Sequence, residues 1–471
     1  MRTRRDLVVI GGGPGGLVVA SVASQLGLKV TLVEKSERLG GDCLHSGCVP
    51  SKTLIRTARV AHLMRTASRY GLPDCEPAVD MGAVMDRVSS VIADIQVHDD
   101  PERFRGYGCD VVFGAARFTG PDEIQVGDEL VRGRRFVIAT GSRPVIPPIP
   151  GLDEAGYETS ETLFHRRDLP EHLAVIGGGP IGLELAQAFA RLGSRISIVE
   201  QADQLLPAAD ADIAGCLAKV LAAEGLALHT GTQVTAARRD GDSRQLQLDD
   251  GNTIECDRIL VATGRQPVLH DLGLDVAGVG FERGGITVDR RLRTTERHIF
   301  AIGDVCGPYP FTHMAEYQAG VVLANVLFRL PRKTDYRVVP VVTYTDPEVA
   351  QVGLTENTAR AQGIHCSVTT FPMADIDRAR TDAATPGFLK ILTSRGRICG
   401  AGLVGAHAGE LIHELALAIQ LRTKAKAITE LVHAYPTYAQ IHRRTLKARY
   451  AKLFYSRKTR FMVRLINRLC P

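Results

Sequence analysis

The sequence predicts an α/β protein with two parallel-sheet units followed by a smaller α+β region. Residues 7–34 and 173–200 each have the pattern of a strand, a glycine-rich turn, a helix and a second strand. A third stretch, beginning near residue 338, carries short β-branched runs and one helical pattern. The 471 residues provide enough chain for about three such domains.

The composition narrows the class of protein. Apolar residues make up 45% of the chain and charged residues 23%, which is ordinary for a globular enzyme and argues against disorder. The apolar run at residues 7–10 is too short for a signal sequence, and no run approaches 18 residues. Ten cysteines are too few for a disulfide scaffold. We therefore expect a cytoplasmic protein in which any disulfide is catalytic.

The first unit places its glycines directly after an apolar strand. Gly11, Gly13 and Gly16 have the spacing G-x-G-x-x-G. The first glycine permits a tight turn, the second admits a pyrophosphate, and the third allows the helix to pack closely on the strand. The second strand ends at Glu34, whose carboxylate suits a ribose hydroxyl.

The second unit repeats this arrangement. Gly177, Gly179 and Gly182 follow the strand at residues 173–176, and Glu200 ends the next strand. One such glycine pattern also occurs in turns that bind nothing, but two complete units favour dinucleotide binding. The sequence therefore predicts two Rossmann-like dinucleotide-binding domains.

The rest of the sequence predicts a linker, the end of the α+β region, and further strands and a helix. A proline-rich stretch at residues 144–150 is expected to be a linker, and the α+β region is expected to end near Arg444. Further strands are predicted within residues 136–141, 259–264, 299–304, 338–342, 387–392 and 398–404, and a helix at 410–421.

Cys43 and Cys48 lie between the first unit and the next helix. A five-residue step along an ideal helix rises ~7.5 Å, beyond the ~6.8 Å Cα limit of a disulfide. A bond between them therefore needs a distorted helix start, for which Gly47 and Pro50 are candidates. The alternatives are a redox disulfide or two thiols that pack as small hydrophobes.

The other cysteines and the histidines suggest no metal site. No pair among them has the spacing of a zinc site. Packing as small hydrophobes is expected of the isolated cysteines, which are Cys75, Cys109, Cys216, Cys256, Cys306, Cys366 and Cys399.

Residues 40–52, G-G-D-C-L-H-S-G-C-V-P-S-K, carry a family resemblance. They are similar to the active-site stretch of the flavoprotein disulfide reductases, the class I pyridine nucleotide–disulfide oxidoreductases that include dihydrolipoyl dehydrogenase and mercuric reductase. Asp42 stands where threonine is usual. The resemblance extends over residues 6–445 and implies FAD on the first unit, NAD(H) on the second, and a C-terminal α+β dimerisation domain that forms a homodimer.

The resemblance also implies domain limits. They are an FAD-binding domain at residues 1–145 and 271–335, an NAD-binding domain at 146–270, a dimerisation domain at 336–444, and a basic amphipathic tail at 445–471.

Site residues follow from the same resemblance. Cys48 faces the flavin, Cys43 attacks the substrate, and Lys52 lies near the flavin and pairs with Glu184. FAD is expected to contact Gly11, Gly13, Gly16, Glu34, Lys52, Ala116, Thr140, Gly141, Ser142, Gly303, Asp304 and Thr312. The nicotinamide nucleotide is expected to contact Gly177, Gly179, Gly182, Glu200, Val234 and Gly264.

The implied activity is electron transfer from NAD(P)H through the flavin and the Cys43–Cys48 disulfide to a small-molecule or protein disulfide, a metal ion or a related acceptor. NADH is favoured over NADPH because Glu200 repels a 2′-phosphate and no arginine follows it. Two alternatives stay open: a membrane-associated NADH:quinone-type reductase and a non-catalytic redox sensor.

The sequence departs from the family at the acid–base position. Members that reduce disulfides carry His-Pro and then Glu, but this chain has Tyr435 and Gln440 at those places. Tyrosine titrates near ~10 and transfers protons poorly at neutral pH, so lipoamide and glutathione disulfide are expected to be poor substrates. Tyr435 is the acid–base candidate by position, and His433, two residues upstream, is expected to be solvated.

Mercuric reductase also lacks this histidine. It uses a vicinal cysteine pair at its C-terminus, however, and this tail carries only Cys470. Mercury reduction is therefore not favoured.

The C-terminal tail concentrates positive charge. Residues 441–471 hold ten Lys and Arg and no acid, so the net charge of +5 leaves −5 for the rest of the chain. We predict an amphipathic helix with one basic and one apolar face. The basic face holds Arg457, Arg460, Arg464 and Arg468, and the apolar face holds Phe461, Met462, Leu465, Ile466 and Leu469.

Three partners suit this helix: the body of the dimer, an anionic surface at the inner face of the membrane, or an acidic protein. Nucleic acid is disfavoured because the body is acidic and carries no binding motif.

Overall fold

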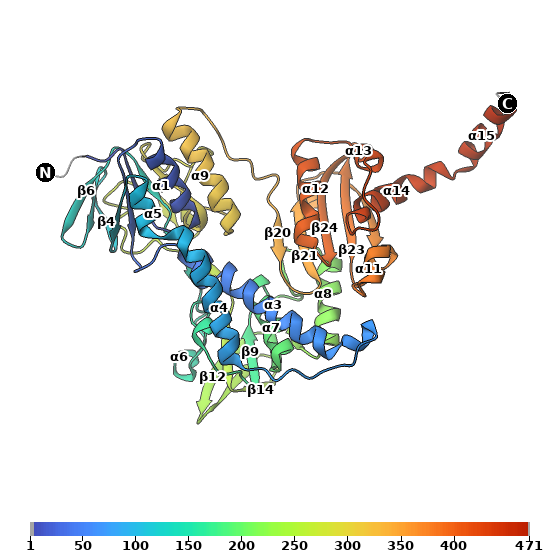
Figure 1. Cartoon of the computed structure of the whole chain (residues 1–471), viewed down its shortest axis with the longest axis horizontal. Coiled ribbons are helices and arrows are strands. Elements are labelled where there is room, and N and C mark those ends of the chain that lie inside the picture. The colour runs from blue at the N-terminus through green and yellow to red at the C-terminus, as the bar shows by residue number, and fades with distance from the viewer. Residues whose placement is uncertain (1–3, 470–471) are drawn as a thin grey trace.

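The computed structural model describes residues 4–469, apart from the side chains of Lys452 and Leu453, and arranges them in three lobes (Figure 1). The first and second lobes carry the two predicted glycine-rich units, and the third lobe carries the predicted α+β region. No helix among the described residues is long and apolar enough to cross a membrane.

The first lobe is a parallel sheet covered on both faces. It contains β1 (Leu7–Ile10), α1 (Pro14–Gln25), β2 (Val30–Glu34), α5 (Pro101–Gly106), β3 (Cys109–Phe113), β4 (Ala116–Gly120), β5 (Glu123–Val126), β6 (Glu129–Arg132), β7 (Phe136–Ile138), β17 (Phe281–Glu282), β18 (Gly285–Ile286), β19 (Ile299–Ala301) and α9 (Thr312–Leu327). The parallel strand order is β19-β7-β1-β2-β3. Leu7 and Val9 join the core beneath α1 and α9, whereas Val8 and Ile10 join the core beneath the antiparallel sheet β4-β5-β6.

The second lobe repeats this layering. It contains α6 (Leu152–Ala155), β9 (His172–Ile176), α7 (Pro180–Leu192), β10 (Arg195–Glu200), α8 (Ala211–Ala223), β11 (Ala227–Thr230), β12 (Val234–Asp240), β13 (Ser243–Leu248), β14 (Thr253–Cys256) and β15 (Arg258–Val261). Its parallel strand order is β11-β10-β9-β15. Leu173 and Val175 pack with α7 and α8, and Ala174 and Ile176 pack with the antiparallel sheet β12-β13-β14.

Three helices connect the first two lobes: α2 (Gly41–His45), α3 (Cys48–Arg65) and α4 (Met81–Gln96). Leu54 and Ala58 of α3 share one core with Leu183 of α7. The strands β8 (Ser142–Pro144) and β16 (Arg265–Pro267) also pair antiparallel between the lobes. The helix that begins at Cys48 is therefore fixed against the nucleotide unit of the second lobe.

The third lobe is an antiparallel sheet with helices on it. It contains β20 (Val341–Thr343), β21 (Glu348–Gly353), α10 (Glu356–Ala361), β22 (Ser367–Pro372), α11 (Asp377–Thr381), β23 (Phe388–Ser394), β24 (Arg397–Gly405), α12 (Ala408–Gln420), α13 (Ala425–Glu430) and α14 (Gln440–Phe454). The strand order is β20-β21-β24-β23-β22. Leu389 and Leu403 of the sheet pack against Ile412 and Leu415 of α12.

Lys390 links the second and third lobes. Its side chain is 2% exposed, and its Nζ lies 2.5 Å from Asp212, 2.6 Å from Glu356 and 3.3 Å from Asp210. A buried cation facing three carboxylates holds the start of α8 against α10 and β23.

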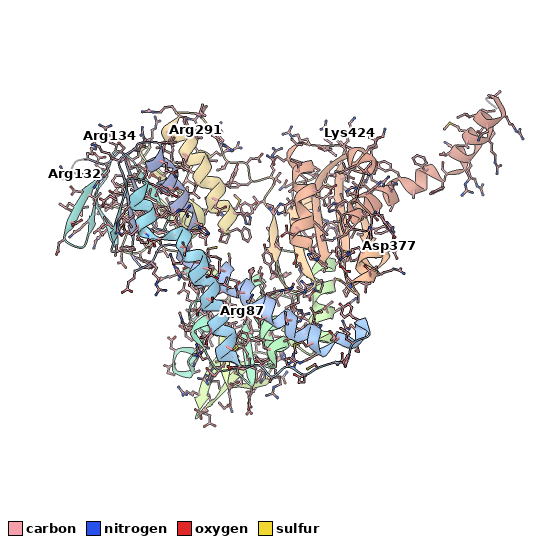
Figure 2. All side chains as sticks on the ribbon, viewed as in Figure 1. Arg87, Arg132, Arg134, Arg291, Asp377 and Lys424 are labelled. Atoms are coloured by element: carbon pink, nitrogen blue, oxygen red, sulfur yellow. The ribbon has the colours of Figure 1, made fainter. Side chains whose placement is uncertain are left out.

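One helix runs across the expected boundary between the dimerisation domain and the tail. α14 crosses the predicted limit at residue 444, and Thr445 and Leu446 are fully buried. Arg444 pairs with Asp377, labelled in Figure 2, at 3.0 Å. The helix continues because its first turns pack on the third lobe, a tertiary contact that charge patterning does not reveal.

A separate helix, α15 (Arg457–Leu469), ends the described chain, as predicted. It projects away from the three lobes (Figure 1), and none of its residues is buried. Phe461 is 68% exposed and Leu469 is 72% exposed. Within one chain, therefore, the apolar face of α15 does not pack on the body.

Candidate functional site

The two cysteines of residues 40–52 lie on either side of a helix break. Cys43 lies in α2, and Cys48 is the first residue of α3. Gly47 forms the break, and a Cβ there would lie 2.9 Å from the carbonyl oxygen of Asp42. Pro50 lies within the first turn of α3 and not at the break. The break allows the two side chains to approach, and their sulfurs are hydrogen-bonded.

The two thiols differ in acidity. The hydrogen bond from Cys43 stabilises the thiolate of Cys48 and lowers the pKa of Cys48 to about 6, aided by Thr312, whose Oγ1 lies 3.4 Å from Sγ, and by the charge of Lys52. The same hydrogen bond, together with burial, raises the pKa of Cys43. The reduced pair therefore holds one negative charge, on Cys48, and one proton, on Cys43.

This asymmetry predicts the labelling chemistry of the reduced protein. The alkylation rate of Cys48 by iodoacetamide should reach half its maximum near pH 6, because the thiolate is the nucleophile. The Lys52→Met variant should shift this midpoint upward, whereas Lys29→Met, at an exposed position directly before β2, should not. Peptide mass spectrometry after timed labelling measures both. A midpoint at or above the ordinary thiol pKa of ~8.5 in the wild type would contradict the assignment.

Lys52 is held by a set of fixed contacts. Its Nζ lies 2.8 Å from Oε2 of Glu184 on α7 and 4.5 Å from the centre of the Tyr344 ring. Oε1 of Glu184 accepts the Tyr344 N–H at 2.8 Å. Burial disfavours the charged form, but the Glu184 carboxylate outweighs it and raises the pKa of Lys52. The expected Lys52–Glu184 pair is therefore present, and it places a permanent cation one helical turn from Cys48.

The first glycine-rich turn has the shape of a phosphate cradle. A Cβ on Gly11 would lie 2.3 Å from the Ala139 carbonyl oxygen, and a Cβ on Gly16 would lie 1.9 Å from that of Gly11. A Cβ on Gly13, by contrast, would meet nothing closer than 3.9 Å. Glycine is thus required at positions 11 and 16, where a side chain would clash with the backbone. Gly13 instead leaves open space before the N-terminus of α1. That space fits a pyrophosphate.

The second turn has the same construction. A Cβ on Gly177 would lie 2.5 Å from the Ala262 carbonyl oxygen, and one on Gly182 would lie 2.1 Å from that of Gly177. A Cβ on Gly179 would meet no atom within 4 Å. This turn therefore also fits a dinucleotide.

A buried carboxylate closes each turn. Glu34 accepts the Gly12 N–H at 2.6 Å, and Glu200 accepts the Gly178 N–H at 2.7 Å. The two carboxylates lie at matching positions at the ends of β2 and β10, the positions at which the sequence predicts contacts with ribose hydroxyls.

Arg265 joins the two lobes at the site and was missed by the sequence analysis. Its guanidinium pairs with Asp42, and its Nε donates to the Ser142 hydroxyl at 2.8 Å. The Ser142 hydroxyl in turn donates to Asp304 at 2.5 Å. Burial raises the pKa of Asp304, against the effect of that hydrogen bond. The available signal was Asp42 itself, because a carboxylate in the usual place of threonine needs a cation.

The other expected cofactor residues are distributed around these turns. Thr140 and Gly141 follow β7, and the Thr140 hydroxyl donates to the Val268 carbonyl oxygen at 3.1 Å. Gly303 donates its N–H to Gln318 at 2.6 Å. The remaining residues mark element ends: Ala116 starts β4, Thr312 starts α9, Val234 starts β12, and Gly264 precedes β16.

Tyr435 and Gln440 lie on the third lobe. Tyr435 is 69% exposed, and no hydrogen bond among the described residues joins it to Cys43 or Cys48 of the same chain. Gln440 donates to the Ala434 carbonyl oxygen at 3.3 Å. The expectation that His433 is solvated is wrong: its side chain is 4% exposed and lies 3.2 Å from Glu414. Glu414 comes from α12, a distant element, so the sequence pattern did not reveal the pair.

A second expectation is also corrected. Cys366 and Cys399 are not isolated, because their sulfurs lie 3.4 Å apart. The register of β23 with β24 shifts between Leu392 and Thr393, which leaves Cys399 as the extra residue of a β-bulge.

Comparison with known proteins gives consistent matches over most of the chain. Residues 5–319 match the pyridine nucleotide-disulphide oxidoreductase family, and residues 339–445 match the dimerisation domain of that family. A mercuric reductase of Streptomyces lividans is 35% identical over 450 residues, covering 93% of this chain and 94% of the relative. A dihydrolipoyl dehydrogenase of Thermus scotoductus is 37% identical over 452 residues, covering 92% of this chain and 95% of the relative.

Solved structures agree with these matches. The HOCl-induced flavoprotein disulfide reductase RclA from Escherichia coli, solved as a Cu(II) complex, superposes with a TM-score of 0.86 at 30% identity, covering 94% of this chain and 99% of that chain.

Proposed function

Because the chain belongs to the pyridine nucleotide-disulphide oxidoreductases, we propose that it passes electrons from NADH through FAD and the Cys43–Cys48 pair to a thiophilic metal ion. Family membership makes it an FAD-dependent oxidoreductase that uses a pyridine nucleotide, which confirms the enzyme class and the α/β fold predicted from the sequence. The match to the dimerisation domain supports a homodimer. No finding favours the membrane-associated quinone alternative.

In the proposed reaction the two cysteines have different tasks. FAD, when bound, supplies the two-electron relay between nicotinamide and the dithiol. Cys48 keeps the thiolate beside Lys52, and Cys43 binds the acceptor through sulfur and releases its proton. The two thiolates then give up two electrons, one to each of two Cu(II) ions, so that the Cys43–Cys48 disulfide forms and two Cu(I) ions are released.

We choose a metal ion as the acceptor because position 435 holds a tyrosine and no histidine base. To reduce a disulfide, Cys43 must lose its proton before it attacks, and the thiolate that leaves the substrate must gain one. Because the pKa of Cys43 is raised, both proton transfers depend on a general acid–base. A soft metal ion displaces the thiol proton when it binds, and its release requires no proton in return. The relatives support this choice, because several are mercuric reductases and RclA was solved with Cu(II).

An anaerobic acceptor screen tests the proposal. NADH oxidation by the holoenzyme should be faster with Cu(II), two ions per NADH, than with lipoamide or glutathione disulfide at equal concentration. Reactions without enzyme correct for direct reduction of the metal. Faster turnover of either disulfide would contradict the assignment.

NADH should have the higher kcat/KM of the two nucleotides. Glu200 is 8% exposed at the end of β10, where a second negative group, the 2′-phosphate of NADPH, would be repelled and desolvated. The Glu200→Gln variant keeps the shape of the side chain but removes its charge. The ratio of kcat/KM with NADH to kcat/KM with NADPH should therefore fall. Asp203→Asn, three residues on, is the matched control. A wild-type preference for NADPH would contradict this account of the site.

We also propose that α15 binds anionic membrane surfaces. Each basic residue near an anionic leaflet contributes ~1 kcal/mol, and the exposed apolar face adds insertion energy. The full chain should sediment with phosphatidylserine vesicles in low salt and separate from them in high salt. A chain ending at Tyr455 preserves the buried Leu446 of α14 and should not sediment. Equal sedimentation of the two chains would refute the membrane role.

A further inference from the structure

The third lobe contains a cluster of two imidazoles and one carboxylate that the redox site does not use. Glu414 comes from α12, His433 from the loop after α13, and His442 from α14. The ligand-type atoms of the three side chains all lie within 4.8 Å of one another. The exposed fractions of the side chains are 4% for His433, 1% for His442 and 25% for Glu414, so the cluster is buried but reachable from solvent through the carboxylate.

Both ring nitrogens of His433 face oxygen atoms. Its Nε2 lies 3.2 Å from each carboxylate oxygen of Glu414, and its Nδ1 lies 3.3 Å from the Leu431 carbonyl oxygen. A neutral imidazole carries one proton, so it satisfies only one of these two sides. A metal ion between Nε2 and the carboxylate would leave this proton on Nδ1, where it can be donated to the Leu431 carbonyl oxygen.

The arrangement of donors matches the metal alternative. With Nδ1–H donating to the Leu431 carbonyl oxygen, Nε2 presents its lone pair toward Glu414, and this backbone hydrogen bond is the usual second-shell support of a metal-bound histidine. His442 also faces the carboxylate, with Nδ1 2.7 Å from Oε2. Its Nε2 is buried without a hydrogen-bond partner among the described residues, so Glu414 is the polar group there that orients this ring.

A second cluster of acidic side chains in the described part of the chain differs because it already contains a cation. Asp210, Asp212 and Glu356 are equally close to one another, but the ammonium group of Lys390 already lies among them. Among residues 4–469, no lysine or arginine forms an ion pair with Glu414, which pairs with the two imidazoles. The cluster of Glu414, His433 and His442 thus lacks the internal cation that the other one has.

We propose that Glu414, His433 and His442 bind one divalent transition-metal ion per chain, with Zn²⁺ as the best-suited ion. Two imidazole nitrogens and one carboxylate oxygen are a common zinc donor set, and water from the exposed side of Glu414 completes four-coordination. The ion joins α12, α14 and the loop between residues 431 and 439. It thereby positions the loop that carries Tyr435, without contacting the redox pair.

Zinc binding to the holoenzyme dimer tests the site directly. The Cys43→Ser/Cys48→Ser chain serves as the background, because zinc would otherwise also bind the two active-site thiols. After removal of metal with a chelator, titration of Zn²⁺ against a chromophoric competitor should give one ion per chain. The Glu414→Gln and His442→Ala variants should each weaken binding by more than the ~10–100-fold that loss of a second-shell partner costs.

A control and a spectroscopic readout separate the metal site from a structural role. His298→Ala, on the first lobe, should leave binding unchanged. Co²⁺ in place of Zn²⁺ should give the visible bands of a four-coordinate nitrogen–oxygen site, lost in Glu414→Gln even if that variant folds normally. Absence of stoichiometric binding, or binding that neither variant weakens, would overturn the proposal and leave a His433–Glu414 hydrogen bond. The result does not depend on turnover, so it is independent of the proposed acceptor.

Discussion

The Tyr435→His/Gln440→Glu variant should reduce lipoamide and glutathione disulfide ~10²–10⁴-fold faster than the wild type, the usual contribution of a general acid–base. The hydrogen bond to Cys48, together with burial, raises the pKa of Cys43, so attack on a disulfide needs a base that takes its proton. A histidine near ~6.5 supplies that base and then protonates the leaving thiolate. The family resemblance implies that the residue at position 435 faces the redox pair of the partner subunit in the dimer, so a histidine placed there is expected to serve that subunit.

The pH profile identifies the new group. The gain in kcat/KM should appear as pH rises through the histidine pKa, because the neutral imidazole is the base. Tyr455→His places a histidine at another exposed tyrosine and should leave disulfide reduction unchanged. High disulfide activity in the wild type, or an equal gain from the control, would refute the role assigned to this position.

The Cys43→Ser variant should lose metal-ion reduction to the background rate while it keeps NADH oxidation with a dye that takes electrons directly from flavin. Serine cannot bind a soft metal as a thiolate or form the disulfide that releases the electron pair. Cys366→Ser removes a thiol of the second close pair and serves as the matched control, with both activities retained. Metal reduction at the wild-type rate in Cys43→Ser would mean that the cysteines are bypassed.

The sequence predicted those parts of the structure that are determined by residues close to one another along the chain. Gly16 and Gly182 are needed within their own turns, because a Cβ would lie 1.9 Å from the Gly11 carbonyl oxygen in the first turn and 2.1 Å from that of Gly177 in the second. The spacing of the glycines therefore indicated both nucleotide units. The alternating cores on the two faces of β1 and β9 likewise follow from short apolar runs.

Contacts between distant elements were not predictable in this way. Arg265 is separated from Asp42 by 223 positions, and only a surplus carboxylate hinted at the pair. The sequence predicted a solvated His433 because Glu414, its hydrogen-bond partner, comes from α12, and His442, which shares that carboxylate, comes from α14. Cys399 seemed isolated because its approach to Cys366 depends on a one-residue shift in strand register.

The most direct test of the electron path is differential alkylation after reduction by one equivalent of NADH under anaerobic conditions. Free thiols of the oxidised holoenzyme are first blocked with one reagent, and thiols that appear after NADH addition are labelled with a second. The account predicts two newly labelled residues per chain, Cys43 and Cys48, with no change at Cys366 and Cys399. Reduction of the flavin with neither Cys43 nor Cys48 newly labelled would contradict it.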